Sequence, residues 1–283
     1  MAHYPRIAPT AVGDFPSGLP PLAGVTVPAA VATIAGGRKL VPVWENEAGG
    51  LTFAVGDGDG EDRCFIKWAP AGSGLDLTAE ADRMTWAGRF HPVPGPLDRG
   101  SDRAGSWLVT TALHGSSAVS PWWIADPATA VTAIGAGLRA MHDALPVAQC
   151  PFSWSAEERF ADARTQAADG RLDPGTWNEC HQGLTVGAAI DRAANIPPVD
   201  KLVVCHGDAC APNTLLARDG HWCGHVDLGL LGVADRWADL AIATWSTEWN
   251  YGPGWEEHLL DAYGIGLDLE RTRYYRLLWD LSS

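Results

Sequence analysis

From Val203 to Ala241 the chain reads VVCHGDACAPNTLLARDGHWCGHVDLGLLGVADRWADLA. An apolar run ends in the polar turn HGD, and a second apolar run ends in VDLG. Short β-rich runs bounded by Gly and Asp are typical of strands, so we expect two strands that pair as a hairpin. That pairing would bring Asp208 and Asp227 to one end of a small sheet, facing the same cleft.

The same stretch offers two competing sets of metal ligands. One set consists of cysteines and histidines: Cys205, His206, Cys210, His221, Cys223 and His225. Cys205 and His206 are adjacent and would point to opposite faces of a strand, and the stretch has no CxxC pair, which structural zinc sites usually show. We therefore interpret the cysteines as small buried apolar residues. A zinc-binding module stays open as an alternative.

The second set consists of oxygen ligands, and it favours different chemistry. Asn213 and Asp227 carry the amide and carboxylate oxygens that suit Mg²⁺. Asp208 would then remain to orient or deprotonate a hydroxyl group. A base, a metal-binding Asn and a later metal-binding Asp together predict phosphoryl transfer. His206 is expected to tie the backbone of the HGD turn together rather than to act as a base.

Length and composition limit the classes of protein. The chain has 283 residues, 46% of them hydrophobic and 19% charged, which is typical of a globular protein of about two lobes. A net charge of −14 argues against a nucleic-acid partner and is compatible with a cationic one. The apolar stretch 21–36 is interrupted by Pro28 and too short to span a membrane. Six widely spaced cysteines indicate reduced thiols, and hence a cytoplasmic protein.

The remaining pattern predicts an α+β fold with a small β-rich N-terminal lobe and a larger, mainly helical C-terminal lobe. Strands are expected at 40–44, 51–55, 63–69 and 106–113. Helices are expected at 28–36, 80–90, 128–145, 156–169, 183–195, 235–246 and 255–264. We place a nucleotide-binding lobe at 1–110, with 1–20 loosely held, and a catalytic and acceptor-binding lobe at 111–283.

These motifs resemble those of the aminoglycoside phosphotransferase family, antibiotic kinases with a protein-kinase-like fold. HGDACAPN with VDLG is similar to the family's catalytic and metal motifs, and VDLGLLGVADRWADLA matches almost residue for residue. FIKWAP, AEADRMTW and SWLVTTALHG follow the N-terminal lobe in the same order. QCPF and YYRLLWDLSS look like segments of the streptomycin and neomycin kinases. The resemblance covers residues 40–283.

The resemblance implies roles for residues of the catalytic region. Asp208 would be the catalytic residue that orients or deprotonates the attacking hydroxyl, and Asn213 and Asp227 would be the Mg²⁺ ligands. Asp239 would brace the catalytic loop. An intact set of these residues argues against a pseudokinase that only binds nucleotide.

Further residues are implied for ATP binding. Lys67 would contact the α- and β-phosphates, Glu80 would hold Lys67, and backbone groups of Thr110 and Ala112 would meet adenine. The nucleotide loop often carries Ser-Gly in the family, whereas Gly49 and Gly50 follow an alanine here, so only backbone N–H groups are left to meet phosphate.

Acceptor recognition depends on acidic residues and on the Trp-rich stretch WSTEWNYGPGW at 245–255. Carboxylates and indole rings suit an ammonium-bearing substrate through ion pairing and cation–π contact. Six carboxylates are the candidates, with Glu248 the foremost: Glu248, Glu179, Asp261, Asp280, Glu256 and Glu257. The C-terminus ends in WDLSS rather than in the acidic, Phe-containing tail of the neomycin kinases.

The expected activity is therefore ATP- and Mg²⁺-dependent O-phosphorylation of an aminoglycoside antibiotic, which would confer resistance. The alternatives are kinases of another cationic antibiotic, such as the tuberactinomycin peptides capreomycin and viomycin, or of a small amino alcohol.

Overall fold

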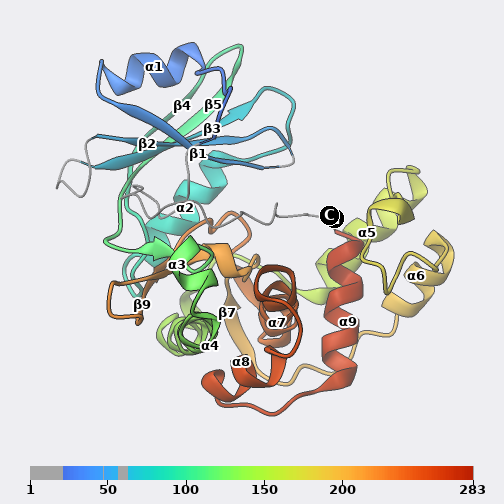
Figure 1. The fold of residues 1–283 in the computed structure, drawn as a ribbon. Helices are drawn as coiled ribbons and strands as arrows, with labels where there is room; N and C mark the ends of the chain where they lie inside the picture. Colours follow the sequence, from blue (N-terminus) through green and yellow to red (C-terminus); the bar gives the residue numbers. More distant parts are fainter. Residues whose placement is uncertain (1–21, 47, 57–62, 283) are drawn as a thin grey trace. The chain divides into compact units, whose positions relative to one another are not determined.

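The computed structural model describes residues 22–46, 48–56 and 63–282 (Figure 1). The expectation for residues 1–20 therefore lies outside the described residues. The described chain divides into two compact units, one made of residues up to 137 together with 211–229 and the other of 138–210 together with 230–282. The lobe boundary expected near residue 110 stays a prediction. None of the helices in the described ranges is long and apolar enough to cross a membrane.

The first unit contains a five-stranded antiparallel sheet in the order β1-β2-β3-β5-β4. Its strands are β1 (Leu40–Glu45), β2 (Leu51–Val55), β3 (Cys64–Pro70), β4 (Pro96–Ser101) and β5 (Gly105–Thr111). Phe53, Ile66 and Val109 are buried on this sheet together with Val31 of helix α1 (Ala29–Ala35). The four strands predicted for this sheet are confirmed. The sheet also contains β4, which the sequence analysis did not predict. It is an edge strand with mostly exposed residues, so its sequence lacks the apolar alternation that marks a half-buried strand.

The first unit also contains a three-stranded sheet in the order β6-β8-β9. The elements are α2 (Leu77–Ala87), β6 (Ser116–Ser117), α3 (Pro121–Ile124), β8 (Thr214–Leu216) and β9 (Trp222–His225). Helix α4 (Pro127–Ala144) begins in this unit and ends in the other.

The second unit is mainly helical and holds a two-stranded sheet, β7 (Leu202–Cys205) with β10 (Gly232–Asp235). Its helices are α5 (Ala156–Ala168), α6 (Val186–Ala193), α7 (Trp237–Tyr251), α8 (Glu256–Tyr263) and α9 (Leu269–Asp280). Short 3-10 turns lie at Val147–Gln149 and Pro174–Thr176, and a third lies at Ala211–Asn213 in the first unit. Trp177, Leu277 and Leu281 belong to one buried core of this unit.

The expected hairpin between the VVC strand and the strand before VDLG is wrong. β7 pairs with β10, and β9 pairs with β8 through the short connection 217–221, which is closed by a hydrogen bond from Ala217 N–H to His221 O. The reason is that a local hairpin needs only a short turn, and such connections dominate strand pairing.

The Trp-rich stretch is also more helical than expected. Helix α7 continues to Tyr251, so Glu248 lies in its last turns rather than after its end. The helix stops at Gly252, whose φ of 91° leaves the right-handed region that a helix requires.

Candidate active site

Lys67 is the centre of an ion cluster in the first unit. Its Nζ donates to Glu80 Oε1 at 2.6 Å and to Asp227 Oδ1 at 2.7 Å. Strand β3 presents the lysine, α2 presents the glutamate, and the segment after β9 presents the aspartate. The expected contact between Lys67 and Glu80 is thus present, and Asp227 joins it. The contact of Lys67 with phosphate remains a prediction.

The electrostatics of the cluster keep Lys67 charged. Burial is the largest single influence on the Lys67 pKa and lowers it. The two carboxylates outweigh burial together, and the pKa lies above its ordinary value. Glu80 is 4% exposed, so its carboxylate depends on the ammonium for compensation.

Asp227 has an unusual backbone. It is the only non-glycine residue in the described ranges with a positive φ, which is 65°. Residues held in this left-handed region concentrate at functional sites, where surrounding structure enforces the conformation. The β8–β9 hairpin supplies that enforcement, since Thr214 pairs with His225 and Val226 N–H donates to Asn213 O at 3.0 Å. Asn213 and Asp227 therefore lie at the same end of this hairpin.

A cavity of about 140 Å³ contains this cluster. Its polar lining includes Lys67, Glu80, Asn213 and Asp227. Apolar lining comes from residues that the site prediction did not include: Val43, Phe65, Met84, Leu215 and Val226. The sequence held one signal for them, because Phe65 and Lys67 are two residues apart on β3 and so share a face of the sheet.

Of the residues expected to contact adenine or to form the nucleotide loop, one lines this cavity and the others do not. Thr110 lines the cavity together with Thr111 and Leu113, whereas Ala112 is not among its lining residues. Gly49 and Gly50 lie in the turn between β1 and β2. Their N–H groups donate to Asn46 O and Asn46 Oδ1, so both amides are engaged within the turn and a phosphate contact through them remains a prediction.

The HGD turn follows β7 in the second unit. Gly207 has a φ of 88°, and a Cβ atom there would lie 2.3 Å from Leu230 O, so only glycine fits. The Asp208 N–H donates to His206 Nδ1 at 3.3 Å, which confirms that His206 ties the turn together. Asp208 itself is half-buried.

Asp239 holds the same turn from helix α7. Its Oδ2 accepts the His206 N–H at 2.6 Å, and its Oδ1 accepts the Gly207 N–H at 3.0 Å. The His142 Nε2 lies 3.0 Å from Oδ2. Burial alone would raise the Asp239 pKa, but His142 and His206 together hold it below its ordinary value. Asp239 therefore braces the HGD turn as a carboxylate, and the brace is the one expected for it.

The cysteine and histidine set does not assemble as a metal site. Within the described ranges, the one group of three potential ligands close enough to share an ion is His142, Cys205 and Asp239. Only Cys205 of the expected set belongs to it, and hydrogen bonds already link its other two members. Cys205 Sγ lies 3.3 Å from Asp235 O, and burial raises the pKa of its thiol well above the ordinary value. The six cysteines all lie in the described part of the chain and form no disulfide.

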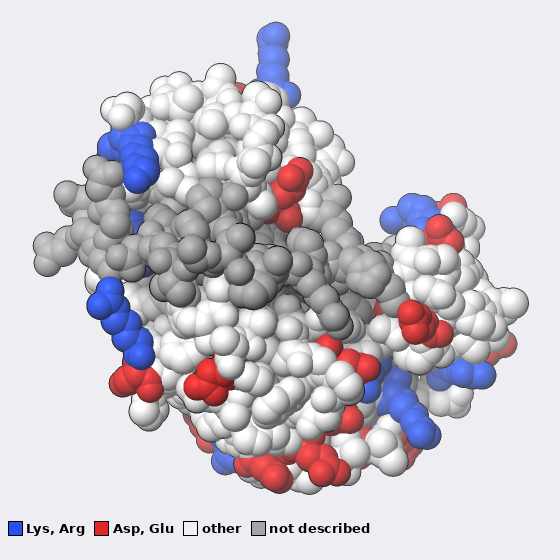
Figure 2. All heavy atoms as spheres, viewed as in Figure 1, with Lys and Arg blue, Asp and Glu red and all other residues white. Residues whose placement is uncertain are grey.

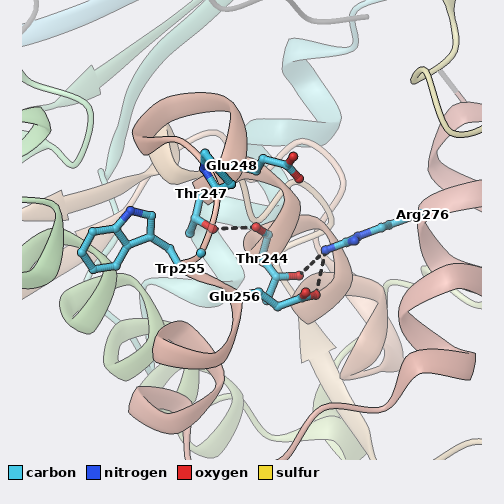
Figure 3. Close-up of a pocket in the computed structure, with 8 residues that line it drawn as sticks. Thr244, Thr247, Glu248, Trp255, Glu256 and Arg276 are labelled. Carbon is cyan, nitrogen blue, oxygen red and sulfur yellow. Dashed lines mark hydrogen bonds and ion pairs between the residues drawn. The ribbon is translucent and has the colours of Figure 1, made fainter.

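A second cavity, of about 120 Å³, lies in the second unit (Figure 3). Glu248, the foremost acceptor candidate, lines it together with Glu256, and both come from neighbouring ends of α7 and α8. Its other lining residues are Thr244, Thr247, Pro253, Gly254, Trp255 and Arg276. Glu248 is exposed, and its carboxylate forms no hydrogen bond or ion pair within the described residues.

The remaining acceptor candidates lie elsewhere in the second unit. Asp280 is 7% exposed and accepts hydrogen bonds from Asn178 N–H and, at 2.6 Å, from His181 Nδ1. Glu179 lies exposed in the same segment as His181, and Asp261 lies exposed on α8. Glu257 is exposed on α8 as well. The structure therefore brings Glu248 and Glu256 into one cavity but does not add the other four carboxylates to it.

Arg276 is the charged residue of this cavity that the sequence did not indicate. It lies on α9, and its Nη2 donates to Glu256 Oε1 at 2.9 Å. No local spacing signals this pair, because the two residues are on different helices and meet only through the packing of α7 with both α8 and α9.

The comparisons with known proteins agree with this geometry. The model of the phosphotransferase enzyme family matches residues 42–275. The aminoglycoside 3′-phosphotransferase of Streptomyces fradiae is 39% identical over 74% of this chain and 81% of its own length. The streptomycin 3″-kinase of Streptomyces griseus is 33% identical over 84% of this chain and 90% of its own length.

A solved structure shares the fold. The aminoglycoside phosphotransferase of Streptomyces rimosus, in complex with ADP and streptomycin, superposes with a TM-score of 0.68 at 30% identity and covers 85% of this chain and 92% of that one. The α+β, protein-kinase-like fold is thereby confirmed. With a family match over most of its length, the chain belongs to the phosphotransferase enzyme family, and the resemblance to aminoglycoside phosphotransferases that its motifs predict is confirmed.

Proposed function

We propose that this phosphotransferase is an ATP- and Mg²⁺-dependent kinase that phosphorylates a hydroxyl group of an aminoglycoside antibiotic and so confers resistance. The observation that carries the proposal is the Lys67 ammonium, which is bound by both Glu80 and Asp227 in a cavity that Asn213 also lines. Relatives that are 39% and 33% identical are an aminoglycoside 3′-phosphotransferase and a streptomycin 3″-kinase, and this supports the acceptor class.

The ligand chemistry of the cavity fits Mg²⁺. Asn213 and Asp227 offer an amide oxygen and a carboxylate at one end of the β8–β9 hairpin, and hard oxygen ligands are those that Mg²⁺ prefers. These two residues would hold the ion. When bound, it would neutralise charge on the β- and γ-phosphates. Lys67 would add a fixed positive charge toward the α- and β-phosphates, and Glu80 would keep its ammonium in position.

Adenine would occupy the apolar part of the same cavity. Val43, Phe65, Met84 and Leu215 provide faces against which a planar base can pack. The backbone of Thr110 and Ala112, at the end of β5, would supply the polar contacts that distinguish one base from another.

Asp208 would act on the acceptor. Its carboxylate would accept the proton of the acceptor hydroxyl as the hydroxyl oxygen bonds to the γ-phosphorus and the bond from that phosphorus to the bridging oxygen of ADP breaks. The brace from Asp239 to His206 and Gly207 fixes the turn that carries Asp208, so the carboxylate would be held in place before the acceptor arrives.

A polycationic acceptor would be held by carboxylates of the second unit. The cavity that contains Glu248 and Glu256 also contains Trp255, which suits an ammonium group. On the face seen in Figure 2, Asp and Glu side chains gather over the region that Figure 1 draws as α7 and α8. Such a surface would draw a polycation toward the unit that carries Asp208.

A phosphate-transfer assay with purified enzyme tests the proposal. ATP or GTP is offered with kanamycin, neomycin, streptomycin, hygromycin, capreomycin or choline, and Mg²⁺ is added or withheld. We expect transfer from ATP to at least one aminoglycoside only when Mg²⁺ is present, and a raised inhibitory concentration of that antibiotic for cells that express the enzyme. Transfer to capreomycin or choline alone would contradict the acceptor class.

Tobramycin, which lacks the 3′-hydroxyl of the kanamycins, is the matched control for the site of transfer. Loss of transfer to tobramycin with retention on kanamycin would assign the reaction to the 3′-hydroxyl. Transfer to streptomycin alone would assign a different hydroxyl within the same class of acceptor.

A further inference from the structure

Arg276 enters the cavity of Glu248 and Glu256 from helix α9 and is fixed there by several contacts (Figure 3). Its Nη2 donates to Glu256 Oε1 at 2.9 Å and to Thr244 Oγ1 at 3.1 Å, and its Nε donates to Ala241 O at 3.2 Å. Its guanidinium carbon lies 5.3 Å from the centre of the Trp245 ring. A carboxylate on one side and an indole face on the other is the arrangement that proteins use to bind a cation.

The protein's own side chain therefore occupies the position that is best suited to a cation in this cavity. Glu256 is neutralised by Arg276, whereas the Glu248 carboxylate is exposed and forms no ion pair within the described residues. Burial lowers the Arg276 pKa, and Glu256 and Glu248 oppose this effect. An arginine stays protonated after such a shift, so the cavity contains two carboxylates and one fixed positive charge.

A fixed guanidinium changes what the cavity can accept. An acceptor ammonium that approached Glu256 would meet a like charge, which is unfavourable in a partly desolvated site. The Arg276 Nη1 makes no hydrogen bond within the described residues and can donate to a hydroxyl oxygen of an acceptor. The cavity is thus arranged for one ammonium, at Glu248, next to one neutral oxygen, at Arg276.

We propose that Arg276 is a specificity-determining residue of the acceptor cavity, where it fills the cation position between Trp245 and Glu256 and so favours acceptors that carry a hydroxyl rather than an amino group at that position. This inference rests on the proposed function, because it assigns the cavity to the acceptor. Trp245 also connects Arg276 to the catalytic turn, since it packs with Cys210, which follows Asp208 closely in the chain.

Two pairs of aminoglycosides test the inference, because each pair differs at a single position. Kanamycin A and kanamycin B carry a hydroxyl and an amino group at C2′, and paromomycin and neomycin carry a hydroxyl and an amino group at C6′. The ratio of kcat/KM between the members of each pair is measured for the wild type, Arg276→Met and Arg276→Lys, with the KM for ATP as a control for folding.

The wild type should favour the hydroxyl-bearing member of at least one pair. In Arg276→Met, which keeps the apolar stem but removes the charge, that ratio should move about tenfold toward the amino-bearing member, as one lost like-charge contact predicts. Arg276→Lys keeps the charge and should keep most of the wild-type preference. The KM for ATP should stay unchanged in both variants.

Glu256→Gln serves as a second probe if Arg276→Met does not fold. Glu256→Gln keeps the Arg276 guanidinium but removes the carboxylate that pairs with it. The ratio of kcat/KM should therefore move further toward the hydroxyl-bearing acceptor. Unchanged ratios in Arg276→Met, or in Glu256→Gln where that variant stands in for it, would overturn the role of Arg276 while leaving the proposed function intact. No transfer to any of the four acceptors by the wild type would overturn both.

Discussion

The two units each contain a cation between carboxylates, but the two clusters are built differently. In the cavity of the first unit, Lys67 pairs with both Glu80 and Asp227 at 2.6 and 2.7 Å. In the cavity of the helical unit, Arg276 pairs with Glu256, and Glu248 stays exposed without an ion pair among the described residues. In the first cluster, which we call closed, both carboxylates pair with the cation. In the second cluster, which we call open, one carboxylate is left that a ligand could bind.

The same difference explains the opposite pKa shifts of the two cations. Burial lowers the pKa of both. Two bonded carboxylates outweigh burial at Lys67 and raise its pKa, whereas one bonded carboxylate does not outweigh burial at Arg276, and its pKa falls. A closed cluster is suited to hold a catalytic group in place, while an open cluster is suited to select a substrate.

Asp208 belongs to neither cluster, so replacing it should separate chemistry from both binding functions. Asp208→Asn is expected to lower turnover by about 10²–10⁴-fold, because a positioned base contributes on that scale. The dissociation constants of ATP and of the acceptor should stay nearly unchanged. Steady-state kinetics with calorimetric titration of each ligand measures both quantities, and near-normal turnover would remove Asp208 from the chemistry.

Asp227→Asn should break the closed cluster. It removes the charge that binds Lys67 and the proposed metal, while Asn tolerates the positive φ of this position. We expect kcat/KM for ATP to fall by about 10²–10³-fold, the scale of losing one preorganised electrostatic contact. The affinity for ATP should also lose its dependence on Mg²⁺.

Asp219→Asn is the matched control for that experiment, because Asp219 is an exposed aspartate on the turn between β8 and β9. Its variant should behave like the wild type. An Mg²⁺-dependent ATP affinity that survives in Asp227→Asn would move the metal site away from this hairpin.

Glu248→Gln should weaken the open cluster in a different way. Loss of one carboxylate–ammonium contact at an exposed site costs about 0.2–1 kcal/mol, so the KM for the acceptor should rise while the KM for ATP stays constant. Glu270→Gln, at an exposed position on α9 that does not line this cavity, provides the comparison and should change neither constant. Equal acceptor constants in the two variants would direct the search to Glu179, Asp261 or Asp280.

Salt should give the smallest effect. The exposed Glu248 carboxylate is screened by ions, so the KM for the acceptor should increase severalfold between low and physiological ionic strength. Glu248→Gln should reduce that increase. An identical salt response in the two enzymes would show that long-range charge, rather than this carboxylate, attracts the acceptor.

The sequence indicated most elements and the charged residues of the cavity in the first unit, because both follow local signals. Apolar alternation marked the strands around Lys67, and the turn motifs marked Asp208 and Asp227. The pairing of β7 with β10 could not be predicted in this way, because both strands are short and lie far apart in the sequence. The strand before VDLG, β9, instead forms a local hairpin with β8, which begins at Thr214. Arg276 was missed for a related reason, because its partner Glu256 belongs to another helix.

The brace that Asp239 forms has a consequence for exchange with solvent. The His206 and Gly207 amides donate to a carboxylate that is fully buried on helix α7, so neither amide can meet water unless α7 itself opens. Their protons should therefore exchange with deuterium as slowly as those of the α7 core, although they lie in a turn. A catalytic turn with the protection of a core helix would keep one shape with or without substrate, and specificity would then depend on the more open surface around it.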